Sequence, residues 1–151
     1  MNTDIQNLIG ETTVYDKKQM LEAKRPKSWL KSVSAFANGE GGTLIFGISD
    51  DDHIVGLADA KGDAERISEE IKSKLDPVPT VNLALKDADG KTLLLLYVYP
   101  GQETPYYYIG DKQRIAFVRI GNESVTADRT QLKALVLKGY GRTYDSLPSN
   151  Y

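Results

Sequence analysis

The side chains in this chain that could do chemistry are charged, and the two signs of charge lie in separate stretches. Between Lys17 and Lys31 the sequence has six positive residues and one negative residue, Glu22. Between Asp50 and Asp76 it has nine acidic residues and four basic ones. Such a separation could attract a phosphate backbone to one face and repel it from another. The alternative is that both stretches are solvated surface, which the net charge of −2 slightly favours.

Phosphate binding is the chemistry that the basic stretch could supply. The residues that we expect to neutralise phosphates are Lys24, Arg25, Lys27 and Lys31, and Arg119 would add a contact from a neighbouring strand. Tyr106 and the two tyrosines that follow it could offer surfaces on which bases stack. Because neighbouring residues of a strand point to opposite faces, one or two of these three rings would be exposed.

Several other kinds of site are excluded or only weakly indicated. The absence of cysteine excludes disulfides, thiolate metal sites and cysteine nucleophiles, and the single histidine, His53, gives little basis for a catalytic triad. Gly90-Lys91-Thr92 imitates the end of a phosphate-binding loop, but Leu85 stands where that loop requires glycine. The three aspartates 50–52 could bind a divalent cation, although such a run is usually only a turn.

The elements that must position these residues follow from periodicity and from turn residues. The sequence predicts a helix that is capped by Ser28 and ends at Asn38-Gly39, a buried strand over 44–46, a helix over 63–75, strands over 81–85 and 93–99 joined by a turn at Asp89-Gly90, a strand over 114–120, and a last helix from Asp128 to Gly139. This order predicts an α/β fold of the α+β kind, with a mixed, largely antiparallel sheet and about three helices.

Length and composition indicate one globular domain. The chain has 151 residues, of which 40% are hydrophobic and 26% are charged. We expect the domain to cover residues 1–140, and residues 141–151 to form a tail or linker. No apolar run approaches the length of a membrane-spanning helix, and no signal peptide is visible at the N-terminus. We therefore expect a cytoplasmic protein with no membrane partner.

An ordered series of short motifs resembles the Schlafen-type AlbA domain. The matching pieces are Leu21-Glu22-Ala23-Lys24, Ala35-Phe36-Ala37-Asn38, Gly41-Gly42, Asp50, Gly56, Tyr97–Gly101, Thr104-Pro105-Tyr106 and Phe117–Asn122. No single piece is diagnostic, but the ordered set is specific. Members of this family are often described as DNA-binding domains of bacterial transcriptional regulators.

The resemblance also implies a second chemistry, because some Schlafen proteins are metal-dependent endoribonucleases with three carboxylates around Mg²⁺ or Mn²⁺. It would make Glu22 and Asp50 the catalytic carboxylates and metal ligands, with Asp51 as the alternative to Asp50. We expect Glu22 to lie on a strand beside the strand that follows Gly42, and therefore close to Asp50. Lys17 stands where the family has its other glutamate and would repel the ion, so we expect no robust cleavage unless Glu11 or Asp51 supplies the missing oxygen.

The function that we expect is that of a nucleic-acid-binding module of a bacterial transcriptional regulator. It would bind DNA or RNA mainly through phosphates and would require no cofactor. The first alternative is a ribonuclease of Schlafen type, and the second is a dimerisation or partner-binding module. The resemblance further implies a homodimer, because the Schlafen core pairs two such lobes, and a winged-helix domain further along a longer chain.

Overall fold

The computed structural model describes residues 14–146, with side chains described as far as Gly141. In chain order the elements are β1 (Tyr15–Lys18), α2 (Lys27–Asn38), β2 (Gly42–Phe46), α3 (Ala60–Lys74), β3 (Leu75–Asp76), β4 (Val81–Ala88), β5 (Lys91–Val98), β6 (Tyr107–Tyr108), the 3₁₀ turn η1 (Gly110–Lys112), β7 (Ile115–Ile120), β8 (Glu123–Thr126) and α4 (Arg129–Ser146). The predicted α+β fold with three helices is confirmed.

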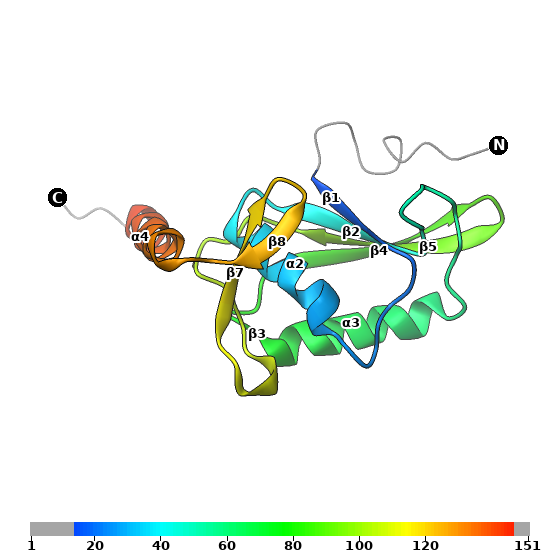
Figure 1. Cartoon of the computed structure of the whole chain (residues 1–151), viewed down its shortest axis with the longest axis horizontal. Helices are drawn as coiled ribbons and strands as arrows, with labels where there is room; N and C mark the ends of the chain where they lie inside the picture. The colour runs from blue at the N-terminus through cyan, green and yellow to red at the C-terminus, as the bar shows by residue number, and fades with distance from the viewer. Residues whose placement is uncertain (1–13, 147–151) are drawn as a thin grey trace.

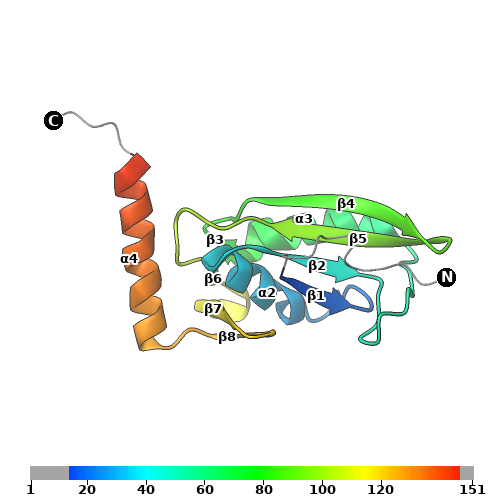
Figure 2. The same ribbon diagram turned by 90° about the horizontal axis from the view of Figure 1, so that it is seen from above.

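The strands form two four-stranded sheets, in the orders β1-β2-β5-β4 and β3-β6-β7-β8. All the strand pairs are antiparallel except β1 with β2, which is parallel. Figure 1 shows α2 and α3 together on one side of the first sheet, and Figure 2 shows α4 at the end of the molecule away from the β4-β5 hairpin. No described helix is long and apolar enough to span a bilayer.

The main core lies between the first sheet and the two helices α2 and α3. Alternate residues of β2 and β5, including Phe46 and Leu94, point into this core and are fully buried. The ring of Trp29 on α2 meets the ring of Phe46 edge to face, with 6.0 Å between the ring centroids. This packing fixes α2 against the sheet. It therefore also fixes the positions from which the other side chains of α2 extend.

Helix α2 begins two residues before its predicted start. Pro26 occupies the N-cap position with φ −64°, and no side chain caps the helix. The prediction that Ser28 caps it is wrong. The predicted end at Asn38 is confirmed, but Gly39 has φ −116°, and the left-handed conformation belongs to Gly41, at φ +84°. A side chain on Gly41 would be 2.7 Å from the carbonyl oxygen of Val98, so glycine is required there.

The other two helices are longer than predicted. Asp59 caps α3 by accepting a hydrogen bond from the Gly62 amide at 3.1 Å, so the helix begins three residues early. The predicted start of α4 is confirmed, because Asp128 and Gln131 bond each other's backbone amides at 2.8 Å. Helix α4 does not end at Gly139, where a side chain would collide with the Thr104 carbonyl. It continues to Ser146, so the predicted tail is helical up to that residue, and 147–151 lie outside the described residues.

Candidate nucleic-acid interface

A basic hollow of about 810 Å³ brings together residues that are far apart in the sequence. We call it the basic cleft. Its lining consists of Ala23, Lys24, Arg25, Pro26, Lys27, Ser28, Lys31, Lys74, Asp111, Phe117, Ser124, Val125 and Thr126. The lining holds five cations and one carboxylate, Asp111. The four residues of the basic stretch that we expect to neutralise phosphates, from Lys24 to Lys31, therefore lie in one hollow.

Three elements position these cations. Lys24 and Arg25 lie in the turn before α2, where the amide of Arg25 bonds the Glu22 carbonyl at 3.3 Å. Lys27 and Lys31 are four residues apart on α2 and therefore lie on the same face of the helix. Lys74 comes from the last turn of α3. The opposite wall is the β7-β8 hairpin, which packs against α2.

Most of these charges have no protein partner that would neutralise them. The side chains of Lys24, Arg25 and Lys31 form no hydrogen bond or ion pair with any described residue. The Lys27 ammonium donates to Gln113 Oε1 at 3.0 Å and lies 5.7 Å from the centre of the Tyr108 ring. Lys74 pairs with Glu70 at 2.7 Å. The cleft can therefore attract anions.

Arg119 is not free for the phosphate contact that the sequence predicted. Its guanidinium forms a two-pronged ion pair with Asp16, and its Nη1 also donates to Ser124 Oγ at 2.9 Å. The Arg119 side chain is only 12% exposed and stacks over Phe36, 5.0 Å from the centre of the ring. Its role is to join β7 to β1, because Nη1 donates to Asp16 and Ser124 and Nη2 donates to Asp16, while the buried Nε–H has no partner among the described residues.

The surroundings of Asp16 favour its ionised form. Burial alone would raise the pKa of Asp16, but hydrogen bonds from Arg119 and Ser32, with the charges of Arg119 and Lys18, outweigh it and lower the pKa. The Ser32 hydroxyl donates to Asp16 Oδ2 at 2.6 Å. Both carboxylate oxygens of Asp16 are thus taken up by protein donors.

Tyr106 does not offer a stacking surface, so that prediction is wrong. Its side chain is 5% exposed, and its hydroxyl accepts a hydrogen bond from the Glu103 amide at 3.1 Å. Tyr108 is 1% exposed, and burial together with its bond to Asp111 raises its pKa to about 12. Only Tyr107 is partly exposed, and Arg114 covers its ring at 4.1 Å.

The predicted carboxylate pair does not lie in one hollow. Glu22 lies in the turn after β1 instead of on a strand, and it lines a separate hollow of about 720 Å³ with Asp63 and Arg66. Asp50 follows β2 and lines a third hollow. The strand beside β2 is β1, Tyr15–Lys18, whose one acidic residue is Asp16. The described residues contain no group of three acidic or histidine side chains that could hold a metal ion.

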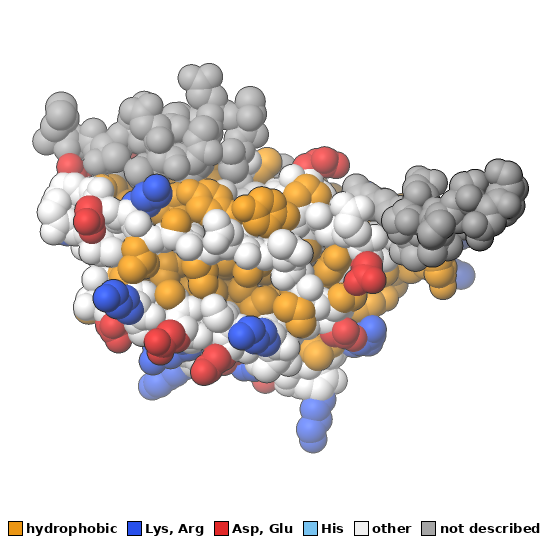
Figure 3. Space-filling model, turned by 180° about the vertical axis from the view of Figure 1, so that it is seen from behind, with side chains coloured by type: hydrophobic (Ala, Val, Ile, Leu, Met, Phe, Trp, Pro, Cys, Tyr) orange, Lys and Arg blue, Asp and Glu red, His pale blue; other side chains and the backbone are white. Residues whose placement is uncertain are grey.

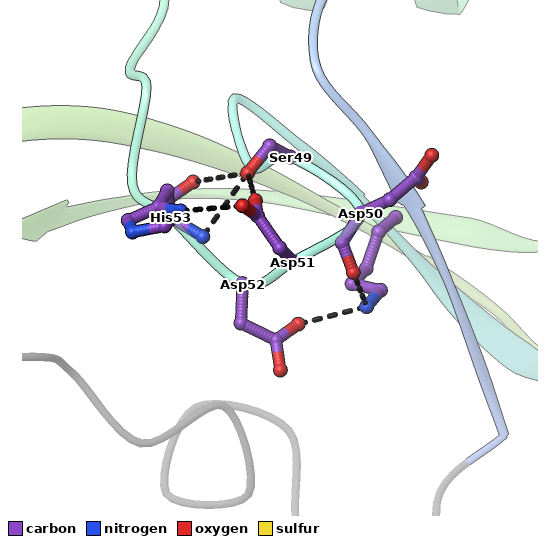
Figure 4. Close-up of polar contacts among 6 residues, drawn as sticks. Ser49, Asp50, Asp51, Asp52 and His53 are labelled. Carbon is purple, nitrogen blue, oxygen red and sulfur yellow. Dashed lines mark hydrogen bonds and ion pairs between the residues drawn. The ribbon is translucent and has the colours of Figure 1, made fainter.

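The negative charge of the acidic turn after β2, residues 50–52, is partly compensated by side chains of the protein that lie beside it. Figure 4 shows the labelled carboxylates of residues 50–52 pointing in different directions. The Lys17 ammonium binds the Asp50 carbonyl at 2.6 Å and the Asp52 carboxylate at 2.8 Å. Hydrogen bonds from Ser49 and His53 lower the pKa of Asp51 to about 2. Lys17 thus holds this turn against β1.

Sequence comparison assigns the chain to a family. A family model described as Schlafen, AlbA_2 matches residues 11–128, and the chain belongs to this family. No curated protein matches the chain.

Two solved structures share the fold. One is the crystal structure of the DIP2311 protein from Corynebacterium diphtheriae, with a TM-score of 0.62 and 21% identity; the match covers 82% of this chain but only 24% of that one. The other is the solution NMR structure of the N-terminal domain of an ATP-dependent DNA helicase RecG-related protein from Nitrosomonas europaea. It has a TM-score of 0.57 and 28% identity, over 80% of this chain and 86% of that one.

Sequence reasoning missed the part of the cleft that comes from distant elements. Lys74 belongs to an acidic stretch and carries no local signal that would assign it to a basic site. Ser124, Val125 and Thr126 lie on β8, a four-residue strand that was not predicted. Only the Gly121-Asn122 pair, which is typical of a tight hairpin turn, could have indicated this hairpin, because Val125 is the single apolar residue of 123–126.

Proposed function

We propose that this domain is the nucleic-acid-binding module of a bacterial transcriptional regulator and that it binds DNA or RNA through phosphate contacts in the basic cleft. The observation that carries the proposal is the gathering of five cations in one hollow of a protein whose net charge is −2. Three of these cations have no partner among the described residues, so phosphates would be their counterions. Binding of this kind requires no cofactor.

The comparisons support a role with nucleic acid. The family model is that of the Schlafen AlbA_2 domain. The Nitrosomonas structure is the N-terminal domain of a DNA helicase RecG-related protein, and both structural neighbours are bacterial. The match covers about a quarter of the Corynebacterium protein. A longer regulator with a winged-helix domain, which the family resemblance implies, is part of the proposal.

The test is the salt dependence of binding to a labelled DNA or RNA oligonucleotide, measured by fluorescence anisotropy. Affinity should fall as salt rises, because each neutralised phosphate releases condensed counterions. The double substitution Lys24→Ala with Lys31→Ala should weaken binding. It should also reduce the slope of log K against log salt by up to about two, one for each lost contact.

The matched control is Lys61→Ala with Lys86→Ala, which removes the same charge from exposed positions on α3 and β4 outside the cleft. It should leave the slope unchanged at protein concentrations at which both double variants have the same oligomeric state, since Lys86 lies on the proposed β4 edge. An equal loss in both double variants would show that the cleft has no special role. No binding at low salt would contradict the proposed function itself.

We also propose that the chain forms a homodimer through the outer edge of β4, which supports the dimerisation alternative beside the first function. Strand β4 has eight residues and pairs only with β5 among the described strands, so one side of its backbone is open. Figure 3 shows hydrophobic side chains gathered in a band on the rear face of the molecule. Open, apolar edge strands are templates for pairing with another strand.

A further inference from the structure

We infer that the basic cleft takes one or two unpaired nucleotides of a single strand, with a base on its apolar floor and the phosphates on its basic rim. The inference rests on the proposed function and adds the substrate class. A strand whose bases are free is required, because a paired base is enclosed in the duplex and cannot enter a hollow.

The size and shape of the cleft fit a nucleotide. Its volume of about 810 Å³ lies within the roughly 300–1,000 Å³ of pockets that enclose small organic ligands. A duplex presents its phosphates on the outside of a wide, stiff rod, so it would contact the rim of such a hollow and leave the interior unfilled. The residues that line the interior of the cleft therefore indicate which ligand the cleft binds.

The floor of the cleft is apolar and aromatic. Phe117 lines it from β7, Val125 from β8 and Pro26 from the start of α2. Phe117 belongs to the main core and is 5% exposed, so most of the apolar surface that a ligand can contact comes from the partly exposed Val125 and Pro26. A phosphate gains nothing from such a floor, whereas the face of a base gains stacking and apolar contact there.

One polar group in the lining has no partner in the protein. The Ser28 hydroxyl is buried and forms no hydrogen bond with any described residue. A buried hydroxyl without a partner costs free energy, which a ligand atom could recover. In the opposite wall, the Ser124 hydroxyl is already bonded to Arg119 and Ser32, whereas the Thr126 hydroxyl forms no hydrogen bond with any described residue. Hydroxyls on two walls around an apolar floor suit a planar, hydrogen-bonding ring such as a nucleobase.

The distribution of charge favours a strand over a free nucleotide. The cations do not converge on one point but follow the wall along the turn and α2, from Lys24 to Lys31, with Lys74 from α3. Lys27 and Lys31 are one helical turn apart, so they can engage different phosphates. Five cations exceed what a single phosphate needs, whereas successive phosphates of a strand can use them.

The experiment compares three labelled probes of equal length at low salt: a single DNA or RNA strand, the same strand with abasic sites, and its duplex. The intact strand should bind most tightly, and the abasic strand should bind at least about fivefold more weakly, because stacking of one base is worth that much or more. Val125→Gln fills the floor without changing the charge. It should weaken binding of the intact strand by a similar factor and leave the slope of log K against log salt unchanged.

Two further variants separate binding from folding. Ser28→Ala removes a buried hydroxyl without a described partner, so it should weaken binding of the intact strand without lowering the temperature of thermal unfolding. Val78→Gln is the matched control for Val125→Gln, because Val78 is 53% exposed in the segment between β3 and β4 and lies outside the cleft. It should leave all binding unaffected.

Equal binding of the three probes, with no effect of Val125→Gln, would overturn this inference and leave the phosphate-binding function standing. Displacement of the strand by free mononucleotide at the same nucleotide concentration would also overturn it, in favour of a nucleotide site. Failure of every probe to bind at low salt would instead refute the proposed function.

Discussion

Arg119 and Lys31 line the same hollow beside β8, yet their surroundings give them different roles. Arg119 is held by Asp16 and Ser124, and its charge is already compensated inside the protein. Lys31 has no described partner, and its charge is available to a ligand. The type of residue therefore does not decide whether a cation binds nucleic acid. What decides is whether a carboxylate of the protein already packs against the cation.

The first prediction at this scale concerns Asp16. Asp16→Asn should lower the free energy of unfolding at neutral pH by about 3 kcal/mol, because it leaves the Arg119 charge enclosed without a counterion. Denaturant titration of both proteins measures the difference. Asp76→Asn is the control, since the Asp76–Arg114 pair has the same chemistry but is more than half exposed. It should cost less than about 1 kcal/mol.

The contribution of Asp16 should also depend on pH. Its pKa in the folded protein is lowered from the ordinary value of 3.8, so folding favours the ionised form. The stabilisation is complete above that value and is lost as pH falls through the lower, folded pKa. The difference in the free energy of unfolding between wild type and Asp16→Asn should therefore become smaller below about pH 4. A gap that is constant down to the acid transition would contradict this role of the ion pair.

These residues show what sequence reasoning could reach at the residue scale. The cations from Lys24 to Lys31 could be predicted as a group because they are neighbours in the chain and need only one turn and one helix to align them. The pairing of Arg119 with Asp16 could not, because it depends on how β7 and β1 come to face α2. The burial of Tyr106 has the same origin.

At the scale of elements, Asn38 is the junction that sets the far wall of the cleft. Its side-chain amide donates to the carbonyls of Tyr106 at 3.1 Å and Phe117 at 2.9 Å, and its oxygen accepts from the Tyr106 amide at 2.7 Å. Ser34, one turn earlier, bonds the same two residues. Helix α2 thus fixes the start of β6 and the middle of β7.

The prediction for this junction is that Asn38→Ala lowers the free energy of unfolding by roughly 3 kcal/mol, because it leaves buried backbone groups unpaired. Asn38→Asp should be at least as harmful near neutral pH, since a carboxylate cannot donate to the two carbonyls. Asn82→Ala, at an exposed position of β4, is the matched control and should change stability by less than about 0.5 kcal/mol. If Asn38→Ala were as stable as the wild type, the proposed role of Asn38 in joining α2 to β6 and β7 would be refuted.

Elements differed in how well the sequence predicted them, for a physical reason. The helices and the β4-β5 hairpin carry local signals, namely an apolar face, the Asp128 cap and the Asp89-Gly90 turn with positive φ at both residues. Strands β1, β3, β6 and β8 have two to four residues each. Their order comes from partners elsewhere in the chain, and so no local pattern marks them.

At the scale of the whole molecule, the basic cleft and the open edge of the first sheet use different elements. The cleft is built by the turn before α2, α2, the end of α3 and the β7-β8 hairpin. The open edge is β4, which forms one side of the sheet and contributes no residue to the cleft. A dimer through β4 would therefore leave both clefts accessible, and two linked clefts would bind one strand more tightly than either alone.

The last prediction tests that dimer. Leu85→Lys places a charge on the β4 edge at a side chain that is already 42% exposed, so it should not destabilise the monomer but should disfavour edge-to-edge pairing. Light scattering over a range of protein concentrations should report a dimer for the wild type and a monomer for this variant. Leu137→Lys is the matched control, because Leu137 is 61% exposed on α4, another surface that exposes large apolar residues. If Leu137→Lys dissociates the dimer and Leu85→Lys does not, α4 is the interface, and a wild type that stays monomeric at high concentration would exclude the dimer altogether.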